Sequence, residues 1–179
     1  MHWLDRLQET TGRHGPRQEC DWTAVESGLG TRLPTDWKEL GVRFGPGSFS
    51  FYVFPLRNGE GADSLLRFWR SLRRKSQEDP EWMAGYFNPF ELYDPTEGSG
   101  LIMWGRSETG GRFYWLADSS ADPATWPLVA RPMWGEEWHP PRHVRFGVHL
   151  ARDRGPRIPA VHGRRSQESA VLSSQPRQD

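Results

Sequence analysis

A chain of 179 residues and 20.7 kDa is long enough for one domain with a sizeable core and too short for two. Hydrophobic residues make up only 35% of it, but ten Trp and nine Phe can still build a core, because each buried aromatic removes roughly 150–250 Å² from water. The formal net charge is zero, the single Cys20 excludes an internal disulfide, and no apolar run reaches the length of a membrane span, so we expect a folded cytoplasmic protein.

The first 45 residues carry three helical patterns. They cover residues 1–10, residues 21–27 and a short stretch that opens with Leu33-Pro34-Thr35-Asp36. Glycines at positions 28 and 30 predict the end of the second helix. The apolar residues of each pattern recur at helical spacing and are expected to point inward: Trp3, Leu4 and Leu7; Trp22, Val25 and Leu29; Trp37, Leu40 and Phe44.

The middle of the chain predicts a strand and then a long helix. The aromatic and β-branched run from Phe49 to Phe54 is typical of a strand. Residues 63–75 form the strongest helical pattern, with apolar residues on one side and arginines on the other. Pro80 and Pro89 frame a segment that we expect to be irregular.

An antiparallel meander is expected to follow. Its strands are residues 91–93, 101–104, 112–116 and 128–130, and Thr109-Gly110-Gly111 forms the hairpin turn between the second and third. A further strand is possible over residues 144–150. Helices that precede a run of strands indicate an α+β fold, with a mainly antiparallel sheet and flanking helices in one domain over residues 1–150. The Arg-, Pro- and Ser-rich residues 151–179 are expected to be disordered.

The order of several short motifs resembles the SUKH superfamily. The matching segments are Leu33-Pro34-Thr35-Asp36-Trp37, Gly100-Leu101-Ile102-Met103-Trp104-Gly105, Ser107-Glu108-Thr109-Gly110 and Trp126-Pro127-Leu128-Val129, within about residues 20–139. That superfamily includes fungal cell-wall regulators of the Smi/Knr type and many bacterial immunity proteins. The chain departs from it after His139, where Pro140-Pro141 and an Arg-rich run replace the amphipathic helix with which members usually close.

The resemblance implies a protein that works by binding another protein. In the immunity proteins, a concave face of the sheet and its loops engage a toxin, often a nuclease or a deaminase. Residues 1–138 hold 15 Lys and Arg against 20 Asp and Glu, a balance of −5. This acidic body argues against direct nucleic-acid binding and favours a basic protein partner. Two alternatives stay open: a regulatory scaffold of the fungal type without a toxin partner, and an enzyme with an unrecognised site.

Seven residues are candidates for contact with the partner. The five carboxylates lie in predicted loops around the meander, where together they could attract a basic toxin: Asp94, Glu97, Glu108, Asp118 and Asp122. Two tryptophans, Trp82 and Trp126, could anchor an interface. Packing in the core is the stronger expectation for both tryptophans.

Chemistry-bearing motifs are missing from the sequence. No nucleophile elbow, phosphate-binding loop or dinucleotide-binding glycine motif occurs. His139 and His143 have the spacing of two metal ligands on a helix, but Pro140-Pro141 makes a helix there improbable. We therefore expect no catalytic residue, no metal, no cofactor and no small-molecule substrate.

Overall fold

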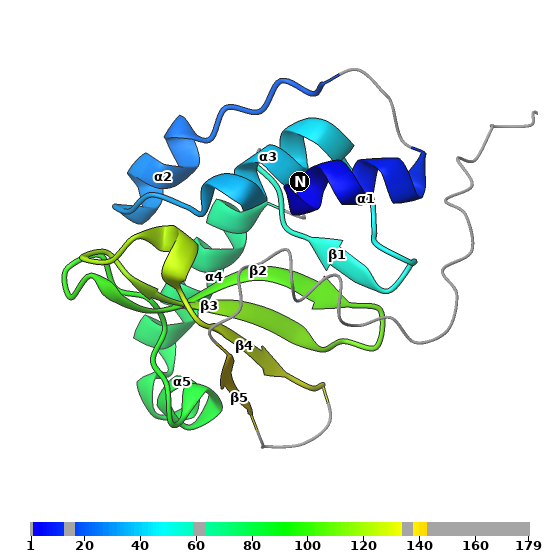
Figure 1. Cartoon of the computed structure of the whole chain (residues 1–179). Coiled ribbons are helices and arrows are strands. Elements are labelled where there is room, and N and C mark those ends of the chain that lie inside the picture. Colours follow the sequence, from blue (N-terminus) through cyan, green and yellow to red (C-terminus); the bar gives the residue numbers. More distant parts are fainter. Residues whose placement is uncertain (1, 13–16, 59–63, 134–137, 143–179) are drawn as a thin grey trace, which may run out of the picture.

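Figure 1 shows the computed structural model of the chain, which describes residues 2–12, 17–58, 64–133 and 138–142. The elements in chain order are α1 (Trp3–Thr11), α2 (Thr23–Leu29), α3 (Thr35–Phe44), β1 (Val53–Pro55), α4 (Leu65–Glu78), α5 (Pro80–Phe87), β2 (Ser99–Ser107), β3 (Arg112–Asp118), the 3-10 helix η1 (Pro123–Thr125), β4 (Leu128–Arg131) and β5 (His139–Arg142). The strands form one sheet in the order β1-β2-β3-β4-β5, and every neighbouring pair is antiparallel. The expected α+β fold with an antiparallel meander is confirmed.

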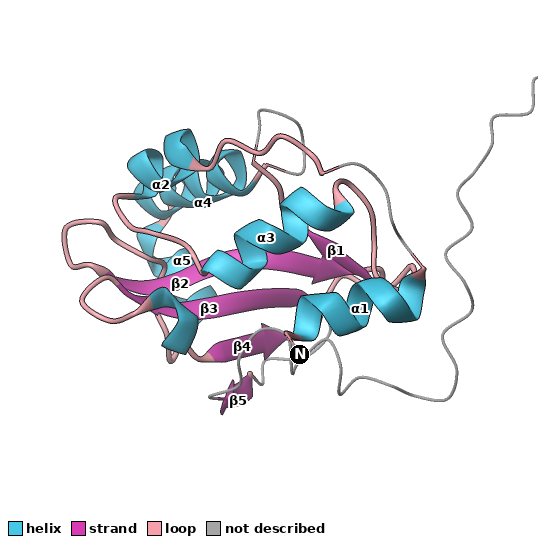
Figure 2. Ribbon diagram, turned by 45° about the horizontal axis from the view of Figure 1, so that its top comes forward, coloured by secondary structure: helices cyan, strands magenta, loops and turns pink. Residues whose placement is uncertain are grey.

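Helices pack on both faces of the sheet (Figure 2). Successive residues of a strand point to opposite faces, and two neighbours on β3 define the two layers. Trp115 meets Trp37 of α3 edge to face, with ring centroids 5.0 Å apart. Tyr114 meets Phe87 of α5 on the other side, at 6.1 Å. The long central strands β2 and β3 are therefore buried between α1 and α3 on one face and α4 and α5 on the other.

The three N-terminal helices form where their apolar spacing predicts them. Every inward position of the second and third patterns is buried, including Trp22, Trp37 and Phe44. Of the first pattern, Leu4 is fully buried while Trp3 and Leu7 pack partly exposed against the core. Among the described residues, no helix is long and apolar enough to cross a membrane.

The segment between the two prolines is a helix, which corrects the irregular segment expected there. Pro80 occupies the first turn of α5, where its missing N–H is not needed. The carboxylate of Asp79 accepts a hydrogen bond from the Trp82 N–H at 3.1 Å and caps this turn. Because Asp79 also ends α4, the two helices follow one another directly.

Two expected strands are shorter than their sequence patterns. The run from Phe49 contributes only its last residues to β1, because Ser50 and Phe51 adopt φ values of +52° and +56° in a tight turn closed by the bridge between Phe49 and Val53. Residues 91–93 form only an isolated bridge between Leu92 and β2. The expected strand at 144–150 and the expected disordered tail lie outside the described residues.

Candidate functional site

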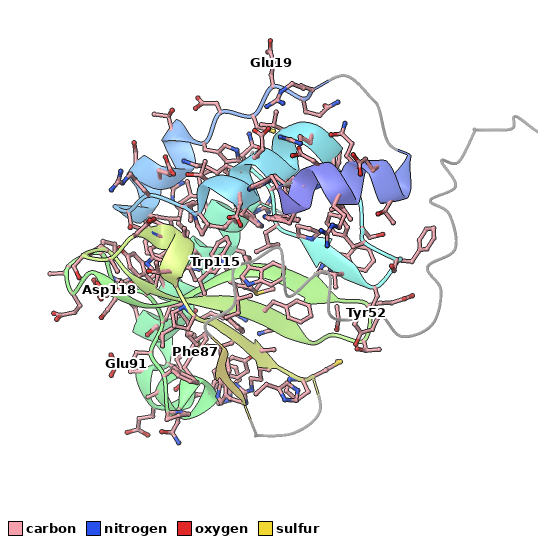
Figure 3. All side chains as sticks on the ribbon, viewed as in Figure 1. Glu19, Tyr52, Phe87, Glu91, Trp115 and Asp118 are labelled. Atoms are coloured by element: carbon pink, nitrogen blue, oxygen red, sulfur yellow. The ribbon has the colours of Figure 1, made fainter. Side chains whose placement is uncertain are left out.

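Two loops at one end of the sheet carry four of the five candidate carboxylates. Asp94 forms an antiparallel bridge with Ser99 at the start of β2, and Ser99 pairs in turn with Asp118 at the end of β3. The N–H of Ser119 donates to the carbonyl of Gly98 at 2.7 Å and holds the two loops together. Figure 3 labels Asp118 at this end of the ribbon.

The other two carboxylates extend the same end. Glu97 is exposed in the turn between Asp94 and β2, and Asp122 is exposed at the start of η1. We call the four residues Asp94, Glu97, Asp118 and Asp122 the acidic loop end. Among the described residues, Asp94 is the only one of the four in an ion pair, with Arg73.

Each aspartate of the acidic loop end also shapes its own turn. Asp94 accepts a hydrogen bond from the Thr96 N–H at 2.8 Å, and Asp122 accepts one from the Ala124 N–H at 3.0 Å. Asp118 accepts from both the N–H and the hydroxyl of Ser120, at 2.9 and 2.6 Å. Aspartate favours turns because its side chain can bind the backbone two residues ahead. These contacts fix the direction of the carboxylates.

The same contacts keep two of the carboxylates ionised. The guanidinium of Arg73, followed by the N–H of Thr96, lowers the pKa of Asp94. Hydrogen bonds from Ser120 lower the pKa of Asp118. Donors that bind the charged form of an acid stabilise that form. Asp94 and Asp118 therefore keep their negative charge to a lower pH than an unperturbed aspartate does.

Glu108 lies at the opposite end of the sheet. It follows β2 in the β2–β3 hairpin, and its N–H donates a hydrogen bond to the carbonyl of Tyr52 at 2.8 Å. Figure 3 labels Tyr52 at the opposite side of the molecule from Asp118. The nine residues of β2 separate the two ends by roughly 25–30 Å at about 3.3 Å per residue. The structure thus brings four candidate carboxylates together and leaves Glu108 apart.

The two candidate tryptophans have different environments. Trp126 is only 3% exposed, and its indole N–H donates to the carbonyl of Asp118 at 2.8 Å. The core position expected for Trp126 is confirmed. The core position expected for Trp82 is wrong, because 57% of Trp82 is exposed and its ring stacks on Tyr86 with centroids 5.3 Å apart. Helix α5, absent from the sequence prediction, places Trp82 at the surface.

An apolar cavity of about 290 Å³ lies between α1, α3 and the turn at residues 46–50, and its lining includes Cys20 and Trp22. Burial raises the pKa of the Cys20 thiol. A catalytic cysteine needs the thiolate form, which a lowered pKa supplies. Cys20 in this setting is a poor nucleophile.

Metal-ligating side chains do not converge in the described part of the chain, where no group of three His, Cys, Asp or Glu could hold an ion. His139 lies on strand β5 and not on a helix. His143, the second histidine of that spacing, lies outside the described residues.

Sequence reasoning missed a second polar cluster, on the face covered by α5. There the side chain of Tyr86 contacts both Arg112 of β3 and Arg131 of β4. The hairpin turn at 109–111 predicts that Arg112 opens a strand. The position of Arg112 opposite Arg131 depends on the register between β3 and β4. No motif in the sequence predicts that register.

Comparison of the chain with protein-family models, with curated proteins and with solved structures finds no match.

Proposed function

We propose that this chain is a non-enzymatic, cytoplasmic protein-binding domain of the immunity type, which neutralises a basic toxin domain such as a nuclease or deaminase. One observation carries the proposal: two separate loops place Asp94, Glu97, Asp118 and Asp122 at one end of the sheet. The SUKH resemblance supplies the class of partner. The acidic loop end supplies the charge that such a partner would meet.

The charge arrangement supports recognition of a basic surface. Glu97, Asp118 and Asp122 have no ion pair within the described residues, so their charges are available to a partner. Clustered exposed carboxylates raise the rate at which a positively charged protein finds the site and select against acidic partners. A nuclease or deaminase needs a basic groove for its nucleic acid, and the acidic loop end would compete for that groove.

The positions of these side chains also support binding. Hydrogen bonds within the turns hold the carboxylates of Asp94, Asp118 and Asp122. Side chains fixed before binding lose less conformational entropy when the partner arrives. Exposed Glu97 completes the surface at the tip of its turn.

The second candidate is a regulatory scaffold that binds a cellular protein through the same surface. The SUKH resemblance includes such regulators, and the acidic loop end would serve either role. The two candidates differ in the identity of the partner and not in the binding surface.

Co-expression separates the two candidates. The protein encoded by the open reading frame next to this gene is expressed in a bacterial host, with and without this chain, and growth is measured. The immunity proposal predicts growth arrest by the neighbour alone and recovery with this chain. A neighbour that arrests growth regardless of this chain, or that is harmless and forms no complex with it, contradicts the proposal and favours the scaffold.

A further inference from the structure

Two arginines lie directly opposite each other in the sheet. Arg112 of β3 and Arg131 of β4 are register partners, so their side chains share one face. Directly opposite like charges destabilise a sheet. Neither guanidinium forms an ion pair with a described residue. An anion between them would remove this repulsion.

Tyr86 of α5 holds both guanidiniums in place. Arg112 Nη1 donates to the Tyr86 hydroxyl at 2.6 Å, while Arg131 Nη1 donates to the Tyr86 backbone carbonyl. The guanidinium carbon of Arg131 lies 3.8 Å from the centre of the Tyr86 ring, and that of Arg112 lies 5.5 Å from it. The two positive groups are therefore fixed before any ligand arrives.

These residues line a cavity of about 380 Å³ between the sheet, α4 and α5. Lys75 adds a third positive group, and none of the lining residues that the structure describes is acidic. The exposed indole of Trp82 is also part of the wall and is nearly parallel to the Tyr86 ring, at 23°. Three cations and an accessible aromatic face thus share one cavity, which we call the arginine cavity.

We propose that the arginine cavity binds a phosphate monoester joined to a planar ring. Guanidinium groups match the oxygens of phosphate in pairs, and a phosphate dianion balances three nearby cations better than a single carboxylate does. The indole of Trp82 offers a stacking surface for the ring. This site lies at the Glu108 end of the sheet, away from the acidic loop end, and the inference does not depend on the proposed function.

Calorimetric titration of the full chain at low salt tests the proposal with three probes: inorganic phosphate, phenyl phosphate and adenosine monophosphate. We expect the two ring-bearing probes to bind at least about tenfold more tightly than inorganic phosphate, because only they stack on Trp82. Tighter binding of phenyl phosphate identifies an aryl phosphate as the ligand. Tighter binding of adenosine monophosphate identifies a nucleotide.

Two variants and a control locate the site. Arg131→Gln should weaken all three probes by at least about tenfold, since it removes one of the two guanidiniums. Trp82→Ala should lower the affinity of the two ring-bearing probes to that of inorganic phosphate and leave the affinity of inorganic phosphate itself unchanged. Arg74→Gln removes a charge from the exposed side of α4 outside the cavity, and the affinities of the three probes should not change. If Arg131→Gln fails to fold, the exposed Trp82 variant decides.

Three outcomes would overturn the proposal. The first is that the folded wild-type chain binds none of the probes at millimolar concentration. The second is that Trp82→Ala binds the ring-bearing probes as tightly as the wild type does. The third concerns Glu136 and Glu137, which lie outside the described residues. If only a Glu136→Gln/Glu137→Gln variant binds phosphate, the chain's own carboxylates neutralise the arginines and no external ligand is needed.

Discussion

The guanidinium of Arg73 lies 2.6 Å from the carboxylate of Asp94 and joins α4 to the acidic loop end. The guanidinium carbon of Arg73 also lies over the ring of Trp69, 5.8 Å from its centre. The indole N–H of Trp69 donates to the carbonyl of Tyr93 at 3.1 Å. Helix α4 therefore supports the loop that carries Glu97 through its contacts with Tyr93 and Asp94.

Asp94→Asn tests this support. The ion pair is about one-third exposed on each side, so its loss should cost at most about 1 kcal/mol at pH 7. The folded-state pKa of Asp94 is lowered. The stabilisation is therefore complete above the unfolded pKa of about 4 and disappears as pH falls through the folded pKa. Urea unfolding from pH 7 down to pH 3 should show the difference from wild type shrinking at the acid end.

Glu78→Gln is the matched control for that ion pair. Arg74 and Glu78 lie 3.7 Å apart and are more than 60% exposed, so the control should change the free energy of unfolding by less than about 0.5 kcal/mol. Equal losses from both variants would contradict the assigned role of Asp94.

The two candidate tryptophans should differ sharply when truncated. Trp126→Ala removes an almost fully buried ring and a hydrogen bond to Asp118, and should cost about 3–5 kcal/mol. Trp82→Ala removes a ring that is mostly exposed and should cost less than about 1.5 kcal/mol, the value of its stacking on Tyr86. Thermal unfolding followed by circular dichroism measures both. Similar losses would contradict the placement of α5.

Gly100 is predicted to be intolerant of any side chain. Its φ is +124°, and an added Cβ would lie 2.6 Å from the Cα of Tyr93. Because backbone atoms cannot easily move aside, Gly100→Ala should cost roughly 2 kcal/mol or more. Gly47→Ala is the control, since a Cβ added there would meet nothing within 4 Å. A neutral Gly100→Ala in urea unfolding would show that β2 and residues 92–93 are not packed as described.

Much of the fold can be predicted from the sequence, because the apolar residues of its helices and central strands recur at regular spacing. Trp37, Leu40 and Phe44 recur at helical spacing and are all buried. The failures have local causes. Pro80 suggested an irregular segment, but Asp79 caps helix α5 and Pro80 lies in its first turn. The strand-like run from Phe49 is interrupted by two residues with positive φ.

The candidate site was partly predictable. In an antiparallel meander, the start of one strand and the end of the next lie at the same end of the sheet. Glu97 precedes β2 and Asp118 ends β3, so their proximity follows from the predicted topology, as does the separation of Glu108 in the hairpin. The pairing of Arg112 with Arg131 was not predictable, because a shift of register by a single residue would separate them.

The affinity of Glu97→Lys for the protein encoded beside this gene is the most direct test of the acidic loop end. If that protein arrests growth in the co-expression test, a variant of it made inactive by a catalytic substitution is titrated with the wild-type chain, with Glu97→Lys and with Glu108→Lys at two salt concentrations. Both glutamates are exposed and without an ion pair among the described residues, so the two variants change charge equally at opposite ends of the sheet. We predict at least about tenfold weaker binding for Glu97→Lys, with the difference reduced at high salt, and near wild-type affinity for Glu108→Lys. Equal affinities of Glu97→Lys and wild type, or a larger loss with Glu108→Lys, would contradict recognition through the acidic loop end.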